Sequence, residues 1–171
     1  SAGDRRITPV GRLVRRYKMD ELLQLWNVLV GDMSLVGPRP QVQREVDLYT
    51  PVERRLLDVR PGITDFASIV FSDEGDILTG RPDPDIAYNQ LIRPWKSRLG
   101  LLYVERRSFR VDLELVALTA VALVSRSAAL AGVARMLDRL GADPELREVA
   151  RRQAPLVPTP PPGAASIVTS R

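Results

Sequence analysis

The stretch Lys18–Pro40, KMDELLQLWNVLVGDMSLVGPRP, constrains the fold of this chain more than any other. Its apolar residues from Leu22 to Leu29 recur at helical spacing, which predicts a helix from about Glu21 to Val30. Gly31 is expected just past the end of that helix, where a left-handed backbone conformation is common. A turn and a short strand are expected over Asp32–Gly37. The Pro-Arg-Pro segment that follows is expected to be extended, because each proline restricts the residue before it.

Two adjacent acids, Asp20 and Glu21, stand where this helix begins. We place Asp20 at the N-cap, because a carboxylate there accepts backbone N–H bonds and is stabilised by the positive end of the helix dipole. Capping is the commoner role for an acid at a helix start. Two neighbouring carboxylates also offer the oxygen ligands that Mg²⁺ prefers, and an ionised Asp beside a phosphate can act as a covalent nucleophile. The spacing alone leaves both roles open.

The composition limits which catalytic groups the chain can use, since it holds no His and no Cys. This excludes His-based catalysis, disulfides, thiolate metal sites and ordinary zinc or non-haem iron sites in this chain. Carboxylates are therefore the expected metal ligands. With 171 residues, of which 44% are hydrophobic, the chain is long and apolar enough for one domain with a buried core.

The formal net charge is +4, and the excess of basic residues is concentrated near the start of the chain. Such a cluster suits anionic lipid headgroups or phosphorylated ligands. Nucleic acid is not an expected partner, because aromatic residues make up only 5% of the chain and no nucleic-acid-binding motif is present. A solvated helix face, the commoner fate of a run of charges, stays open as an alternative. The basic residues are Arg5, Arg6, Arg12, Arg15, Arg16 and Lys18.

Proline, glycine and capping signals predict that the rest of the chain is mostly helical. Thr-Pro at residues 8–9 and the Thr-Pro-Val-Glu box at residues 50–53 are helix-start signals. A strand is expected over Thr64–Phe71, where apolar residues alternate. The fold class is therefore α+β, mostly α-helical with a small β-hairpin or short sheet. Helices are expected over residues 8–16, 21–30, 41–49, 50–57, 84–92 and 95–107.

The window Leu115–Ala134 is twenty residues long, enough in length to span a bilayer. Arg126 lies near its middle, and a central arginine is costly in hydrocarbon. We therefore expect a break near Ser125 and two shorter helices. These helices either lie on a membrane surface with their apolar faces down, or pack as a buried and an amphipathic helix in a soluble core. The pattern does not choose between the two.

The C-terminal part is expected to contribute structure but no catalysis. Ser72–Asp76, further upstream, is expected to be a solvated acidic loop, with a loop that faces the sugar as the alternative. A last short helix is expected from Asp143 to about Arg152. The proline-rich tail after it should be extended or disordered. We divide the chain at residue 142, with residues 143–171 forming the short helix and tail.

The segment DELLQLWNVLVGDMSLVGPRP closely resembles the signature of the bacterial sugar transferase family, the monotopic phosphoglycosyl transferases. DRRITPVGRLVRR (Asp4–Arg16), VRPGIT (Val59–Thr64) and LLYVERRSFRVDLELVALT (Leu101–Thr119) resemble other blocks of that family. The resemblance covers roughly residues 4–124. One departure is Leu23, which replaces the proline of the usual Asp-Glu-Leu-Pro-Gln.

The resemblance implies a catalytic Asp-Glu dyad at Asp20 and Glu21. Asp20 would attack the β-phosphate of a UDP-sugar and release UMP, and polyprenyl (undecaprenyl) phosphate would then take the phosphosugar from Asp20. Glu21 would help to hold Mg²⁺. Arg15 and Arg39 match family positions expected to contact phosphate or nucleotide, which suits the fixed donor fork of arginine.

The resemblance also implies a cellular setting. Residues 1–142 would be a monotopic, membrane-associated catalytic domain at the cytoplasmic face of the bacterial inner membrane, with a homo-oligomer left open. It would start exopolysaccharide, capsule or O-antigen assembly. We interpret the chain as lacking the N-terminal re-entrant helix of the family, which leaves open whether it is active alone. The alternative is a non-catalytic membrane-surface interaction domain derived from such an enzyme.

Overall fold

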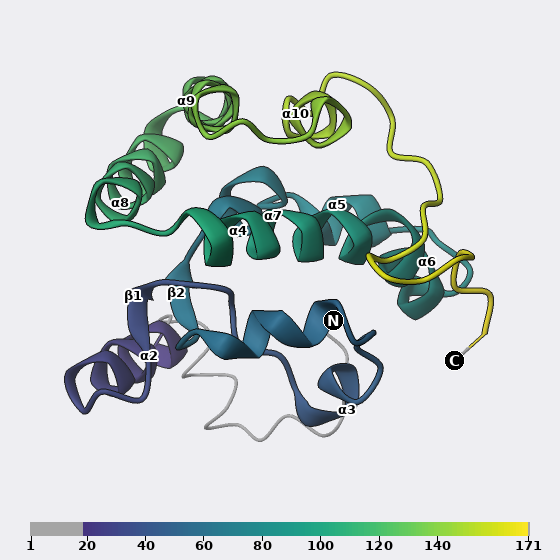
Figure 1. Cartoon of the computed structure of the whole chain (residues 1–171), viewed down its shortest axis with the longest axis horizontal. Coiled ribbons are helices and arrows are strands. Elements are labelled where there is room, and N and C mark those ends of the chain that lie inside the picture. Colours follow the sequence, from purple (N-terminus) through teal and green to yellow (C-terminus); the bar gives the residue numbers. More distant parts are fainter. Residues whose placement is uncertain (1–18, 171) are drawn as a thin grey trace.

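The computed structural model describes residues 19–170, and the side chains from residue 23 on. Helix α7 runs through the middle of the molecule (Figure 1). Helices α8, α9 and α10 arch over one side of it, and the strands with α2, α3 and η1 lie on the other. The elements in chain order are α2 (Met19–Leu29), β1 (Ser34–Val36), α3 (Gln43–Val46), η1 (Glu53–Asp58), β2 (Gly62–Thr64), α4 (Phe66–Val70), α5 (Glu74–Leu78), α6 (Pro84–Leu91), α7 (Arg93–Arg106), α8 (Phe109–Val124), α9 (Arg126–Arg139) and α10 (Pro144–Ala150).

The stretch from Met19 to Val36 folds in the predicted order of helix, turn and strand. Gly31 has φ +88°, which confirms the left-handed residue expected after the helix. The strand over Ser34–Val36 is confirmed as well. The N-cap assignment of Asp20 was wrong: Met19 before it is already helical, so Asp20 and Glu21 both lie inside α2. A residue preceded by helical backbone is part of the helix rather than its N-cap.

The two short strands form a parallel sheet rather than a hairpin. Ser34 pairs with Gly62 and Val36 pairs with Thr64, and residues 37–61 make the connection that parallel pairing requires. The short-sheet alternative of the prediction is confirmed. The close approach at Gly62 demands glycine, because a Cβ there would lie 2.1 Å from the Gly37 backbone nitrogen.

The strand predicted over Thr64–Phe71 was wrong beyond its first residue. Asp65 caps helix α4 instead: its Oδ1 accepts hydrogen bonds from the Ser68 backbone N–H at 2.8 Å and from the Ser68 hydroxyl at 2.7 Å. The helix buries Phe66 and Ile69 on one face. A three-residue capping contact therefore prevails over the alternating apolar pattern.

Several predicted helices are confirmed with small changes of length. The Thr50–Glu53 capping box forms, with Glu53 N–H bonded to Thr50 Oγ1 at 3.1 Å and Thr50 N–H bonded to Glu53 Oε1 at 3.2 Å. It opens a 3₁₀ rather than an α-helix, and the helix expected over Gln41–Tyr49 shortens to four residues. The break at Ser125 separates α8 from α9, and Ser125 Oγ accepts the Ala128 N–H at 3.2 Å.

The core gathers around α7, whose Trp95, Leu99 and Tyr103 are almost fully buried. Helices α4, α8, α9 and α10 supply most of the other buried side chains. Gly132 lets α9 pack tightly on α8, since a Cβ there would lie 2.3 Å from a Leu118 methyl group. Within residues 19–170, no helix has both the length and the apolar character needed to cross a bilayer.

The acidic segment and the tail are more ordered than the sequence suggested. Asp73 is not in a solvated loop: it forms ion pairs with Arg152 at 2.7 Å and with Arg126 at 3.0 Å. Residues 153–170 hold no helix or strand, yet they fold back over the molecule. The Thr159 N–H bonds to the Gln90 carbonyl at 3.0 Å. The division of the chain at residue 142 stays a prediction.

Candidate functional site

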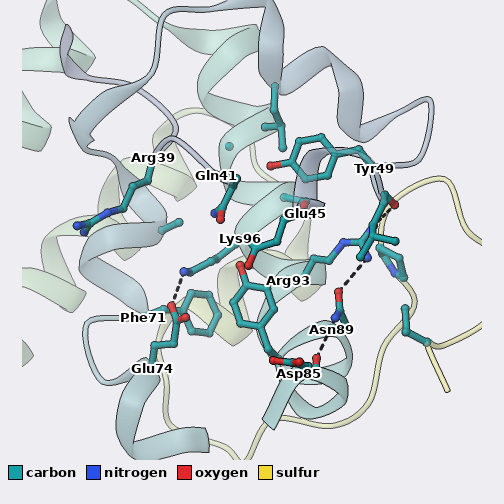
Figure 2. A pocket seen from close by; sticks show the side chains of 18 of the residues that line it. Arg39, Gln41, Glu45, Tyr49, Phe71, Glu74, Asp85, Asn89, Arg93 and Lys96 are labelled. Carbon is teal, nitrogen blue, oxygen red and sulfur yellow. Dashed lines mark hydrogen bonds and ion pairs between the residues drawn. The ribbon is translucent and has the colours of Figure 1, made fainter. Parts of the chain in front are cut away.

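A pocket of about 1080 Å³ lies between the Pro-Arg-Pro segment, the α4–α5 turn, α6, α7 and the C-terminal segment (Figure 2). Its wall carries several charged side chains of both signs, along with tyrosine, amide and apolar groups. A pocket of this size accommodates a nucleotide-sized ligand. The charged residues on its wall are Arg39, Arg44, Glu45, Asp65, Glu74, Asp85, Arg93 and Lys96.

Arg39 is the predicted binding residue that the structure places in this pocket. The flanking prolines stiffen its backbone, and the parallel pairing of β1 fixes where the segment starts. Its side chain is exposed, and it forms no ion pair with an acidic side chain among residues 23–170. Its donor fork is therefore open to an anionic ligand.

Asp65 is a buried carboxyl group on the pocket wall. Burial raises its pKa above the ordinary value, because a charged carboxylate is poorly solvated there. Its hydrogen bonds to Ser68 and the positive charges of Lys96 and Arg39 act in the opposite direction. Lys96 and Arg39 therefore both lie close enough to the buried Asp65 to favour its charged form.

Lys96 is a second pocket cation, and we did not identify it from the sequence. It projects from α7 and forms an ion pair with Glu74, which Figure 2 shows as a dashed line. Its ammonium group also lies 5.4 Å from the centre of the Tyr88 ring. The available signal was its position next to Trp95 and three residues before Leu99, since a lysine close to core positions of a helix needs a partner.

Arg93 and Glu53 form a buried ion pair beneath the pocket, and their side chains are 9% and 0% exposed. Arg93 Nη2 and Nε lie 2.6 Å and 3.1 Å from the two oxygens of Glu53, a bidentate arrangement. Ser97 Oγ–H also donates to Glu53, at 2.6 Å. Arg93 further bonds to the Leu48 carbonyl and to Asn89, so the pair joins η1 to α6 and α7.

The other predicted site residues lie at or beyond the edge of what the structure describes. Asp20 and Glu21 have their backbone in α2, and their side chains lie outside the described part. Arg15 lies outside residues 19–170 altogether. Among the side chains of residues 23–170, no three acids gather as a metal-binding cluster. The structure therefore places Arg39 beside Asp65 and Lys96, and the roles of the dyad and of Arg15 stay predictions.

Comparison with known proteins identifies the family to which this arrangement belongs. The family model described as bacterial sugar transferase matches residues 1–126, which include α2, the small sheet, α7 and all of α8. The chain belongs to the bacterial sugar transferase family. The resemblance recognised in the signature segment is confirmed over a longer stretch than the motifs alone covered.

Three relatives of this sugar transferase chain show what it resembles, and the names of two of them include undecaprenyl phosphate. It is 41% identical over 114 residues to an uncharacterised sugar transferase, EpsL, of Bacillus subtilis, covering 67% of this chain and 48% of EpsL. It is 36% identical over 126 residues to the undecaprenyl-phosphate galactose phosphotransferase of Salmonella typhimurium, covering 74% of this chain and 23% of the relative. For the UDP-glucose:undecaprenyl-phosphate glucose-1-phosphate transferase of Caulobacter vibrioides, the identity is 41% over 101 residues, covering 55% and 38%. The chain spans less than half the length of each.

Proposed function

We propose that this chain carries the catalytic core of a phosphoglycosyl transferase that moves a sugar-1-phosphate from a UDP-sugar to polyprenyl phosphate. The observation that carries the proposal is the position of Arg39. The signature segment of the family places this arginine in the wall of a pocket large enough for a nucleotide sugar, and among the side chains of residues 23–170 it has no acidic ion-pair partner. The names of the relatives support a UDP-sugar donor and an undecaprenyl phosphate acceptor. The product would enter the synthesis of a bacterial polysaccharide.

In the proposed reaction Asp20 is the nucleophile. One of its carboxylate oxygens forms a bond to the β-phosphorus of the UDP-sugar, and the bond from that phosphorus to the bridging oxygen breaks. UMP leaves with the bridging oxygen and its electron pair, so a phosphosugar remains on Asp20. A phosphate oxygen of the polyprenyl phosphate then attacks the same phosphorus. The aspartyl oxygen leaves, which regenerates Asp20 and gives a polyprenyl diphosphate sugar.

The described pocket residues would bind the anionic part of the donor. Arg39 would donate hydrogen bonds to phosphate oxygens, and Lys96 would add a second positive charge if phosphate displaces Glu74 from its ammonium group. Arg15 would serve the same anion. Asp20 and Glu21 supply hard oxygen ligands that fit Mg²⁺, which typically binds one or two carboxylates together with substrate phosphates. Bound Mg²⁺ would neutralise charge on the diphosphate.

Two helices at one end of the molecule support docking on a membrane surface. Helix α2 and helix α8 both contact β1 and lie at the same end of the molecule in Figure 1. Each leaves large apolar side chains exposed, an arrangement typical of helices that lie in the lipid interface. We propose that this end faces the cytoplasmic leaflet of the inner membrane. The exposed side chains are Leu23, Leu25, Trp26 and Leu29 on α2, and Phe109, Leu113, Val116, Val121, Leu123 and Val124 on α8.

The first test is UMP release from a panel of UDP-sugars in the presence of Mg²⁺ and undecaprenyl phosphate. It compares this chain with a version extended at its N-terminus by the preceding segment of a relative. Release by the extended version is expected, and Asp20→Asn should abolish the trapped phosphosugar adduct. Arg39→Ala should lower kcat/KM roughly tenfold to a hundredfold, the loss of a charged hydrogen bond. Arg55→Ala is the matched control, because Arg55 is a half-exposed arginine that pairs with Glu105 outside the pocket.

Two results would contradict this function. Undiminished adduct in the Asp20→Asn variant would remove Asp20 from the nucleophile role. UMP release by neither protein, over the whole panel and with folding verified by circular dichroism, would favour a non-catalytic membrane-surface domain. An unchanged rate of UMP release after removal of Mg²⁺ with a chelator would refute the proposed role of Mg²⁺ in the reaction.

A further inference from the structure

The last segment of the chain forms part of the pocket wall. We name Thr159–Ser170 the strap. The match to the bacterial sugar transferase family ends at residue 126, so the strap lies outside the portion that the family model describes. Six of its residues that line the pocket are Pro161, Ala164, Ser166, Ile167, Val168 and Thr169.

The strap is held in place by hydrogen bonds at three points along its length. The Thr159 N–H donates to the Gln90 carbonyl at 3.0 Å, and Gln90 Nε2–H donates to the Val168 carbonyl at 2.6 Å. Between these points, Thr50 Oγ1–H donates to the Pro162 carbonyl at 2.5 Å. Gln90 of helix α6 therefore holds both ends of the strap, and Thr50, which precedes η1, holds its middle. The strap itself has no helix or strand.

A glycine makes this close packing possible. Gly163 has φ +85°, a conformation that side-chain-bearing residues rarely adopt. A Cβ at this position would also lie 2.7 Å from Val52 Cγ2 and 3.0 Å from Thr50 Oγ1. Any larger residue would push the strap away from η1 and thus out of its present path along the pocket.

The chemistry of the strap differs from that of the wall with Arg39 and Lys96. The strap TPPPGAASIVTS contains no charged and no aromatic residue. It offers hydroxyl groups, backbone carbonyls and small apolar side chains. In Figure 2 the C-terminal segment runs on the side of Asn89 and Arg93, and Arg39 lies on the other side of the pocket. The strap is thus an uncharged stretch of a wall that elsewhere carries charges of both signs.

We propose that the strap is the sugar-recognition wall of the pocket and sets which UDP-sugar is accepted. This inference rests on the proposed function. A nucleotide sugar has an anionic diphosphate, which fits the cations Arg39 and Lys96, and a neutral sugar with many hydroxyl groups. Hydroxyls and carbonyls hydrogen-bond sugar hydroxyls, and apolar side chains contact the C–H faces of the ring. The absence of aromatic residues from the strap disfavours the uracil base as its ligand, because bases are commonly held by stacking.

The test measures dissociation constants by calorimetry for UDP, UDP-glucose, UDP-galactose and UDP-N-acetylgalactosamine. It uses the protein of the UMP-release assay and two altered forms. One ends at Pro158, and the other carries Gly163→Ala, which displaces the strap without removing it. Gly141→Ala is the matched control: Gly141 also has positive φ, at +70°, but a Cβ there meets nothing within 4 Å and the residue does not line the pocket.

The intact protein is expected to prefer one sugar by about tenfold or more, the effect of one or two neutral hydrogen bonds. Both strap variants should lose that preference while the dissociation constant for UDP stays within about threefold, and Gly141→Ala should keep the preference. An unchanged sugar preference in both strap variants overturns the inference and leaves the proposed function intact. Tighter UDP binding after strap removal also overturns it, because the strap would then be a plug. Failure of the intact protein to bind UDP or any UDP-sugar would refute the proposed function itself.

Discussion

Replacing Glu53 by glutamine is expected to destabilise the fold strongly, because the change leaves a buried positive charge without its partner. Arg93 is 9% exposed, and both of its donor contacts to Glu53 are direct. Glutamine keeps the size of the side chain and one acceptor oxygen, which can still serve the Thr50 cap. Its amide group, however, presents donors to the guanidinium group, where the carboxylate offered an acceptor.

The size of the effect follows from the burial of the pair. Removing one partner of a buried ion pair costs about 3–5 kcal/mol in free energy of unfolding. A domain of this size has a total stability of about 5–15 kcal/mol. Since 1 kcal/mol corresponds to about 2–4 °C at this length, the melting temperature should fall by roughly 6–20 °C.

Urea and thermal unfolding followed by circular dichroism at neutral pH would measure this change. Glu105→Gln is the matched control, because it breaks the Arg55–Glu105 pair, whose side chains are 51% and 50% exposed. That variant should lose less than about 1 kcal/mol. The double variant Glu53→Met, Arg93→Met should cost less than the two single changes added together, because it removes both buried charges.

A loss of less than about 1 kcal/mol in Glu53→Gln, equal to the exposed control, would refute the reasoning. It would mean that water or a rearranged side chain replaces the carboxylate at Arg93. An additive double variant would likewise show that the two residues act independently, contrary to their bidentate contact.

Three further predictions concern the sheet, a buried acid and the membrane. Gly62→Ala should cost more than about 2 kcal/mol in urea unfolding, because its Cβ would clash with the backbone of the paired strand; an unchanged midpoint would contradict this. The pKa of Asp65 is raised by burial, so its contribution to stability is present below its ordinary pKa of 3.8 and is lost as pH rises through the higher folded-state pKa. Asp65→Asn, which can still cap α4, should flatten that part of the stability–pH curve, and an unaltered curve would refute the assignment. Replacing Trp26 and Leu29 by serine should weaken flotation with anionic vesicles at least about tenfold, whereas the exposed control Val157→Ser should not; equal effects would exclude α2 from the interface.

Signals that act over three or four residues were predicted well from the sequence. The capping box at Thr50 and Glu53, Gly31 after α2, and the break at Ser125 all appear in the structure. Each depends on hydrogen bonds or backbone preferences within one turn, so the local sequence contains the whole cause. The strand predicted up to Phe71 was wrong for an equally local reason, because the Asp65 side chain caps a helix that starts at Phe66.

Contacts between distant segments were not predictable in the same way. A parallel pairing and a hairpin suit the same short strands, and only the path of residues 37–61 decides between them. Lys96 and the strap were missed for this reason, since each gains its role from a segment far away in the chain. The burial of Glu53 is another case: a capping residue became half of a buried ion pair forty residues apart in sequence.

The sequence by itself determined the family, through one long contiguous signature, and most helix positions, through caps, prolines and apolar spacing. It also fixed the available chemistry, because a chain without His or Cys must rely on carboxylates and basic side chains. Tertiary structure decided the parallel sheet, the placement of Arg39 beside Asp65 and Lys96, and the return of the strap to the pocket. The physical reason is that helix signals are complete within a few residues, whereas a pocket exists only where the packing of a whole core brings distant segments together.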